Sequence, residues 1–201
     1  MKRWIFSIAA TICTIFPTAA SATFSIVACD QSGACGAAVA TNNLAVGASV
    51  IYARARIGAL ATQFETNPNY GREALALLAD GASPDDVLKS LLANDGNFDG
   101  QDISYRQVGI VAATGDGVAY TGSRAWEAHW AGSLAGPGYS VQGNGLAGPD
   151  VAAAMQQAYL TSKGSLAERL ITALEAGEAA GGQSMGKLSA ALLVRTPDGA
   201  W

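Results

Sequence analysis

The sequence predicts an α+β fold of four layers, in which two antiparallel β-sheets lie between two pairs of helices. Short segments with strand character are joined by tight turns, which is typical of antiparallel hairpins and not of parallel βαβ units. Helical segments arrive in pairs, in the order strands, two helices, strands, two helices, strand. Helix pairs of this kind cover the outer faces of sheets, which gives an αββα sandwich.

Residues 1–22 have the three parts of a secretory signal peptide. Lys2 and Arg3 precede an apolar run over residues 4–16, and small residues at 20–22 form the cleavage box. The run is shorter than the roughly 20 apolar residues that span a bilayer. We therefore expect export to the periplasm or the extracellular space, with no membrane attachment once the signal is removed.

Cleavage after this box leaves Thr23 as the first residue of a single domain over residues 23–201. A free N-terminal Thr carries a hydroxyl and an amine on the same residue, and the amine can act as the base that activates the hydroxyl. An ordinary Thr after a signal peptidase cut is the alternative. A cut after Ala20 would remove the catalytic interpretation.

Charge and composition exclude several classes of partner. Loss of Lys2 and Arg3 with the signal changes the formal charge from −4 to −6. An acidic surface argues against binding to nucleic acid or to anionic membranes. Half of the residues are hydrophobic and 14% are charged, which argues against disorder. We expect no metal and no cofactor, and the sequence leaves a homodimer as one alternative for the assembly.

The first two strands are expected at residues 23–29 and 35–41, and a hairpin-like turn joins them. Cys29 and Cys35 flank this turn and could face each other across the two strands. An even pair of cysteines in an exported protein predicts a disulfide. Two small buried thiols are the alternative.

Residues 44–63 contain the clearest period-2 pattern of the chain, which predicts a strand with two different faces. One face is uniformly apolar and must meet a core. The other face carries two guanidinium groups and a phenol, and it points to solvent or to an anionic ligand. Its residues are Tyr52, Arg54, Arg56, Gly58, Leu60 and Thr62.

Two pairs of helices follow from their start signals. In the first pair, Asn67-Pro68 precedes a helix to Asp80, and Ser83-Pro84 opens a second one with acidic residues in its first turn. The second pair covers residues 150–163 and 165–180, the latter opened by a capping box.

The polar loop between the first helix pair and the next strand resembles half of a calcium loop. Asp95, Asn97, Asp99 and Gly100 follow the D-x-N-x-D-G pattern. Arg106 stands where the bidentate Glu should be, and a strand follows in place of a helix. A simple turn-rich loop is therefore the alternative to a calcium site.

The later part of the chain predicts a hairpin, a long loop and two further strands. Residues 143–148 spell G-x-G-x-x-G after one of these strands, but the surrounding hairpins argue against a dinucleotide site. The alternative is a tight glycine turn that aims backbone N–H groups and the Asn144 amide at an oxyanion. The expected strands and loop are 107–113, 118–123, loop 124–138, 139–142 and 188–195.

Ordered matches along the chain resemble the N-terminal-nucleophile-hydrolase-like family known as domain of unknown function 1028. The resemblance implies an αββα sandwich with Thr23 at the start of the first strand, and it implies no known reaction. The matching segments are residues 23–28, 44–47, 58–63, 66–71, 106–109, 120–122, 130–132, 138–148 and 166–170.

The chain also departs from that family's pattern. Gln183, Met185 and Lys187 stand where Asp and Arg are usual, and Ala125 lies near a position that often holds a cysteine. Family members continue beyond the position of Trp201. A fragment, or a domain that lacks an edge strand, are the two expectations that follow.

Together these observations predict an exported N-terminal-threonine amidohydrolase that acts on an unidentified small-molecule or peptide amide. Thr23 would attack the carbonyl, Arg54 would keep the amine neutral, and Asn144 would hold the oxyanion. The alternative is a non-catalytic exported binding or structural domain with the same fold. The expected substrate contacts are Tyr52, Arg56, Gln63 and Tyr70.

Overall fold

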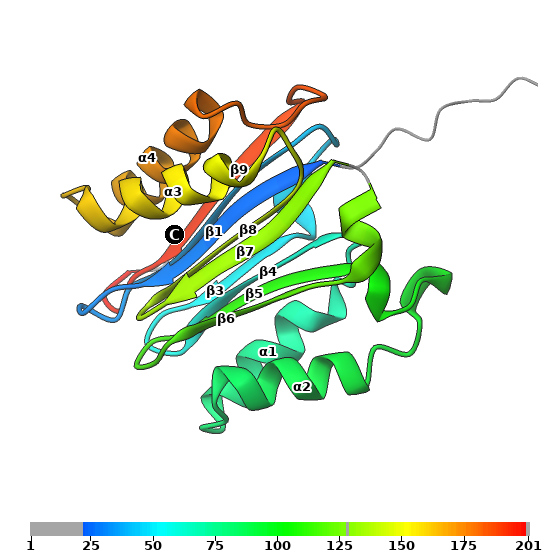
Figure 1. Cartoon of the computed structure of the whole chain (residues 1–201). Coiled ribbons are helices and arrows are strands. Elements are labelled where there is room, and N and C mark those ends of the chain that lie inside the picture. Colours follow the sequence, from blue (N-terminus) through cyan, green and yellow to red (C-terminus); the bar gives the residue numbers. More distant parts are fainter. Residues whose placement is uncertain (1–21, 128, 200–201) are drawn as a thin grey trace, which may run out of the picture.

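The computed structural model describes residues 22–127 and 129–199. Two antiparallel sheets pack face to face, and a pair of helices covers the outer face of each sheet (Figure 1). The predicted α+β fold with four αββα layers is confirmed. The predicted signal peptide lies outside the described residues, except for Ala22.

The first sheet has five strands, and the strand that begins at Thr23 lies in its centre. The order is β7-β8-β1-β2-β9, and all neighbours are antiparallel. Its strands are β1 (Thr23–Cys29), β2 (Cys35–Thr41), β7 (Trp130–Gly136), β8 (Tyr139–Leu146) and β9 (Ser189–Arg195).

The second sheet has four strands in the order β3-β4-β5-β6, again antiparallel. All four of its strands pack against the first sheet, with β3, β4, β5 and β6 lying opposite β2, β1, β8 and β7 in turn. Its strands are β3 (Ile51–Arg54), β4 (Gly58–Phe64), β5 (Arg106–Ala112) and β6 (Gly117–Thr121).

Local signals explain where the helices begin. Ser83 accepts a hydrogen bond from the Asp86 N–H at 3.2 Å, and Ser165 and Glu168 form the predicted capping box. In Figure 1 the first two helices cover the second sheet and the last two cover the first sheet. The helices of the described chain are α1 (Asn69–Ala79), α2 (Pro84–Ala93), α3 (Pro149–Thr161) and α4 (Leu166–Ala179).

Short 3₁₀ helices fill the connections. One lies before β3, two lie between α2 and β5, and one lies between β6 and β7. They are η1 (Val46–Ala48), η2 (Phe98–Gly100), η3 (Ile103–Tyr105) and η4 (Ser123–Glu127).

The space between the two sheets is apolar at one end and polar at the other. Val27, Val39, Ala61 and Val111 pack together in its apolar part. Thr23 and the polar residues near it occupy the opposite end, where their side chains are also buried. A buried polar group needs hydrogen-bond partners, so the side chains at this end must be paired with one another or with the backbone.

Cys29 and Cys35 are paired across β1 and β2 and form a disulfide, as predicted. The bond closes the hairpin at the apolar end of the sandwich. None of the helices in the described chain combines the length and the apolar character that a bilayer-spanning segment requires.

Three predicted elements differ from the structure. The period-2 pattern over residues 44–63 is broken by a turn around Arg56, whose φ is 62°, and so forms the β3–β4 hairpin. The expected loop 124–138 contains β7. The expected glycine turn at 143–148 is largely a continuation of β8 through Leu146, because strand pairing with β1 and β7 extends over it.

Candidate active site

Thr23 is the first residue of the central strand of the first sheet and is 3% exposed. Its neighbours across the sheet are Thr41 of β2 and Asn144 of β8. Side chains alternate between the faces of a strand. Because Val27 and Cys29 of the same strand face the second sheet, Thr23 does so as well. Three polar side chains therefore meet at one end of the space between the sheets.

The hydroxyl groups of Thr23 and Thr41 lie 3.0 Å apart. Thr41 Oγ1 donates to the carbonyl of Ala22 at 2.9 Å, and a hydroxyl has a single hydrogen to donate. The Thr23 hydroxyl is therefore the donor toward Thr41. Ala22 is itself fully buried, and its N–H donates to Asn42 Oδ1 at 2.9 Å. Ala22 is thus held through both its N–H and its carbonyl.

Asn144 has one amide atom engaged and one without a partner. Its Nδ2 donates to Gln107 Oε1 at 2.8 Å. Its Oδ1 is buried and has no hydrogen-bond partner in the structure. Leaving a buried carbonyl oxygen unpaired costs about 1–3 kcal/mol. Such a group next to Thr23 is a candidate acceptor for a donor that the uncleaved chain does not supply.

Gln107 of β5 positions Asn144 from the second sheet. Its Nε2 donates to the carbonyls of Gly143, at 2.8 Å, and Gly132, at 3.3 Å. Because carbonyl oxygens only accept, this end of the amide must be the nitrogen. Gln107 Oε1 then accepts from Asn144 and from Gln63 Nε2 at 2.7 Å. The orientation of all three amides follows from these bonds.

Gln63 connects Thr23 to a second group of buried polar residues. Its Nε2 donates to the Thr23 carbonyl at 3.3 Å, and its Oε1 accepts from Ser25 Oγ at 2.6 Å. Ser25 Oγ accepts in turn from Gln142 Nε2 at 2.6 Å. The network is made of neutral amide and hydroxyl groups. Gln63 is the predicted substrate contact that lies beside Thr23.

Arg54 and Arg56 do not lie near Thr23, so the predicted role of Arg54 beside the amine and that of Arg56 as a substrate contact are wrong. Arg54 ends β3, and the Arg56 N–H donates to the Gly33 carbonyl at 2.8 Å. Gly33 lies in the turn beyond the far end of β1. A seven-residue strand spans about 20 Å, which separates the two arginines from Thr23. Both side chains are exposed.

Tyr52 and Tyr70 also lie away from Thr23, because α1 covers the face of the second sheet on which Tyr52 stands. A Cβ on Gly71 of α1 would lie 2.2 Å from the Tyr52 ring, so the ring packs against the helix. Tyr70 is 1% exposed, and its hydroxyl donates to Asp95 Oδ2 at 2.7 Å. Their prediction as substrate contacts of the Thr23 site is wrong.

The loop that resembles a calcium site binds an arginine of the chain itself. Arg106 Nε lies 3.0 Å from Asp95 Oδ2, and its Nη2 donates to the carbonyls of Phe98 and Gln101 at 2.7 and 2.6 Å. A guanidinium thus occupies the oxygen-lined centre of the loop. Within residues 22–127 and 129–199, no cluster of three or more His, Cys, Asp or Glu side chains could hold a metal ion.

The sequence interpretation missed Thr41, Gln107 and Gln142. Each is a buried polar residue of a strand that the sequence predicts. That pattern is itself a signal, because a buried amide needs a partner on a facing strand. The pattern does not identify the hydrogen-bonding partner, because the partner depends on how the two sheets are stacked.

Comparison with known proteins gives a family and two solved structures. The model of a family of unknown function, DUF1028, matches residues 23–201. The crystal structure of protein SPO2555 from Silicibacter pomeroyi, described with the same family model, is 35% identical, with a TM-score of 0.78 over 88% of this chain and 74% of that one. Thiobacillus denitrificans BPH in complex with Epoxomicin is 15% identical, with a TM-score of 0.44 over 87% of this chain and 98% of that one. No curated protein matches.

Proposed function

The chain belongs to the family of unknown function DUF1028, and from this premise we propose that it is an exported N-terminal-threonine amidohydrolase. The observation that carries the proposal is the buried Thr23 hydroxyl, hydrogen-bonded to Thr41 and paired across the sheet with Asn144. The family match begins at Thr23, which is also the first residue of β1. The predicted signal cleavage would expose its amine at this place.

Removal of the residues before Thr23 would change the hydrogen bonds of the site. The Ala22 carbonyl, which takes the hydroxyl hydrogen of Thr41, would be lost. Thr41 could then donate to Thr23 Oγ1, which would free the Thr23 hydroxyl hydrogen for the new α-amine. Desolvation disfavours a charged ammonium, so burial would help to keep this amine neutral and able to act as a base.

The reaction would begin when Thr23 Oγ1 attacks the carbonyl carbon of an amide while its proton passes to the α-amine, directly or through one water. The C–N bond of the substrate would then break, and the leaving amine would take that proton. Water would hydrolyse the resulting ester by the same route in reverse. Threonine is thereby restored.

Asn144 has free capacity for this chemistry on both atoms of its amide. One Nδ2 hydrogen is used by Gln107, and the other could donate to the oxyanion of the tetrahedral intermediate. The unpartnered Oδ1 could accept a hydrogen bond from the α-amine of Thr23. The disulfide between Cys29 and Cys35 supports the exported state, because such bonds persist in oxidising compartments.

The test begins with the mature N-terminus. The full chain would be expressed with export, and its first residue read by N-terminal sequencing and intact mass. Mild periodate cleaves a free 1,2-amino alcohol, so it should convert a mature Thr23 to a glyoxylyl group.

A β-lactone tests whether the hydroxyl is activated, because it acylates activated hydroxyls. We expect a single adduct on Thr23 that the Thr23→Ala variant lacks and the Thr161→Ala control keeps.

Turnover of an amide panel completes the test. Thr23→Ala should abolish hydrolysis, whereas Thr161→Ala, at an exposed helix position, should leave it unchanged. A mature start at another residue, or hydrolysis that survives Thr23→Ala, would favour the alternative of a non-catalytic exported domain or a different site.

A further inference from the structure

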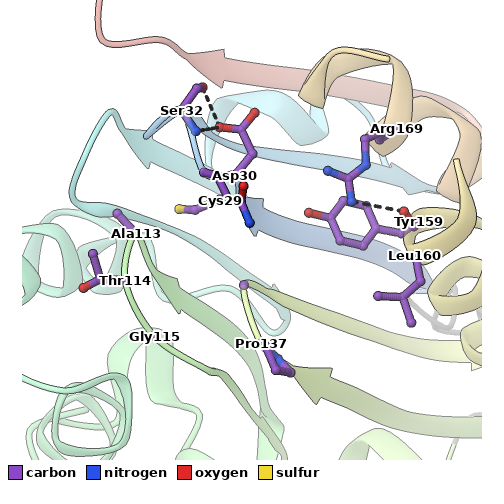
Figure 2. Close-up of a pocket in the computed structure, with 12 residues that line it drawn as sticks. Cys29, Asp30, Ser32, Ala113, Thr114, Gly115, Pro137, Tyr159, Leu160 and Arg169 are labelled. Atoms are coloured by element: carbon purple, nitrogen blue, oxygen red, sulfur yellow. Dashed lines mark hydrogen bonds between the residues drawn. The ribbon is translucent and has the colours of Figure 1, made fainter. Parts of the chain in front are cut away.

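A cleft of about 580 Å³ opens at the end of the sandwich opposite Thr23. Figure 2 shows Tyr159 and Arg169, from α3 and α4, on one wall, and Asp30 and Ser32, from the turn after β1, on the other. The β5–β6 turn, with Thr114, closes a third side. The candidate active site does not use any of these residues.

Arg169 presents a guanidinium to this cleft without an ionic partner. Its Cζ lies 4.2 Å from the centre of the Tyr159 ring, and its Nη2 donates to the Tyr159 carbonyl at 3.2 Å. Its Nε is buried and has no hydrogen-bond partner. Among the described residues no carboxylate lies within ion-pair distance of it. A partly buried guanidinium that is held in place but unpaired is suited to binding a carboxylate.

Asp30 presents a carboxylate from the opposite wall. Its Oδ1 accepts hydrogen bonds from the N–H and hydroxyl of Ser32, at 2.9 and 2.6 Å, and from the Ala34 N–H at 3.2 Å. These bonds fix the side chain and do not use Oδ2. Asp30 is near enough to Tyr159 for its charge to add to the effect of burial in raising the pKa of that phenol. The two opposite charges therefore face one cleft without forming an ion pair.

We propose that this cleft binds a small zwitterion with one carboxylate and one protonated amine, of the kind presented by a free amino acid or a short peptide. Arg169 would bind the carboxylate through its planar fork. Asp30 Oδ2 would accept from the ammonium. Leu160 and Pro137 line the same cleft and would contact the apolar part of the ligand.

The presence of both charges favours this ligand over a simple ion. An anion without an amine would approach Arg169 but would be repelled by Asp30. A cation without a carboxylate would approach Asp30 but would be repelled by Arg169. A ligand with both charges can pair with Arg169 and with Asp30 at the same time.

Calorimetric titration of the full chain tests this site. The probes are the common free amino acids and a set of dipeptides, each compared with its N-acetylated and its C-amidated form. We expect at least one unblocked probe to bind, and each blocked form to bind about tenfold more weakly or worse. Tighter binding of free amino acids or of dipeptides shows which of these two kinds of ligand the cleft takes. Failure of every unblocked probe, or equal binding of the blocked forms, would overturn the proposal.

Variants locate the binding in the cleft. Arg169→Gln and Asp30→Asn should each weaken binding about tenfold, and Asn keeps the Oδ1 acceptor that holds the turn. Arg169→Lys keeps the charge and covers the case in which the Gln variant folds poorly. Arg72→Gln, the same change at an exposed position of α1, should bind normally. Thr23→Ala should also bind normally, so this result is independent of the proposed hydrolase activity. Binding unaffected by both cleft variants would place the ligand elsewhere.

Discussion

Arg106 and Asp95 form a buried, two-pronged ion pair, with Nε 3.0 Å from Oδ2 and Nη2 3.2 Å from Oδ1. Arg106 is fully buried and Asp95 is 7% exposed. Tyr70 and Asn67 donate to the same carboxylate, at 2.7 and 3.1 Å. The pair therefore ties the start of α1 and the loop after α2 to the first residue of β5.

Arg106→Gln should be among the most destabilising substitutions in the chain. It leaves the Asp95 carboxylate buried with its countercharge removed, and breaking such a pair costs about 3–5 kcal/mol. Urea unfolding followed by circular dichroism measures the loss. Arg72→Gln at an exposed position should change the free energy of unfolding by less than about 0.5 kcal/mol. A similar small loss for Arg106→Gln would mean that water reaches the pair.

Acid should weaken the fold through Asp95. Burial raises the pKa of this carboxyl, but hydrogen bonds from Arg106, Tyr70 and Asn67 outweigh burial and hold the pKa below its ordinary value of 3.8. Because the folded-state pKa is the lower one, the stabilisation is complete above the unfolded-state pKa and is lost as pH falls through the folded-state value. The window therefore lies below about pH 4.

Asp95→Asn removes this titration and supplies the comparison. The variant should be less stable than the wild type at neutral pH, and the difference between the two should shrink as pH falls below about 4. Free energies of unfolding between pH 2 and about 7 measure it. A difference that stays constant across this range would assign the acid sensitivity to other carboxyls.

Much of the fold could be predicted from local sequence signals. The caps at Ser83 and Ser165 place their helices correctly, because capping depends on residues three positions apart. The Cys29–Cys35 hairpin is equally local. The strand Trp130–Gly136 was missed, since its two glycines and two alanines have low strand propensity and pairing with β8 overrides it.

The site was predicted only in part, because it depends on long-range register. Thr23 and Asn144 were both selected from the sequence, and strand pairing brings them together. Arg54 was placed at the wrong end of the sandwich. The period-2 pattern identifies the face of a strand, whereas the end at which a residue lies depends on hairpin direction and on the stacking of two sheets. For the same reason the contacts of Gln107 could not be predicted from the sequence.

The disulfide should contribute modestly to stability because it closes a short loop. Its cysteines are six positions apart, and the loop-entropy relation gives roughly 2 kcal/mol for such a ring. The Cys29→Ala, Cys35→Ala double variant should lose about this amount in urea unfolding. Dithiothreitol should lower the stability of the wild type to a similar extent and leave the double variant unchanged. A reductant effect on the double variant would contradict the assignment.

Gly109→Ala should disturb the polar end of the sandwich. A Cβ at this position would lie 2.0 Å from Gln142 Oε1, so the Gln142 amide, which donates to Ser25, must shift. Overpacking of this kind costs about 1–3 kcal/mol. Gly115→Ala is the matched control, because its Cβ would make only ordinary contacts, the nearest at 3.7 Å. Equal unfolding free energies for the two variants would show that Gln142 is free to rearrange.

Gln107→Met separates the support of Asn144 from general packing. The thioether keeps the length of the side chain but removes the oxygen that accepts from both Gln63 and Asn144. Two buried amide nitrogens then lose a partner, which should cost about 2 kcal/mol or more. Gln157→Met, at an exposed position of α3, should cost less than about 0.5 kcal/mol.

The same variant also reports on the proposed chemistry. If Asn144 holds the oxyanion, its loss of orientation in Gln107→Met should lower kcat more than it raises KM for any amide that the wild type hydrolyses. Reaction of Thr23 with the β-lactone should slow in parallel, while periodate oxidation of the N-terminus should not change. A purely structural network would lower the free energy of unfolding and leave both kcat and the rate of acylation at their wild-type values below the melting range.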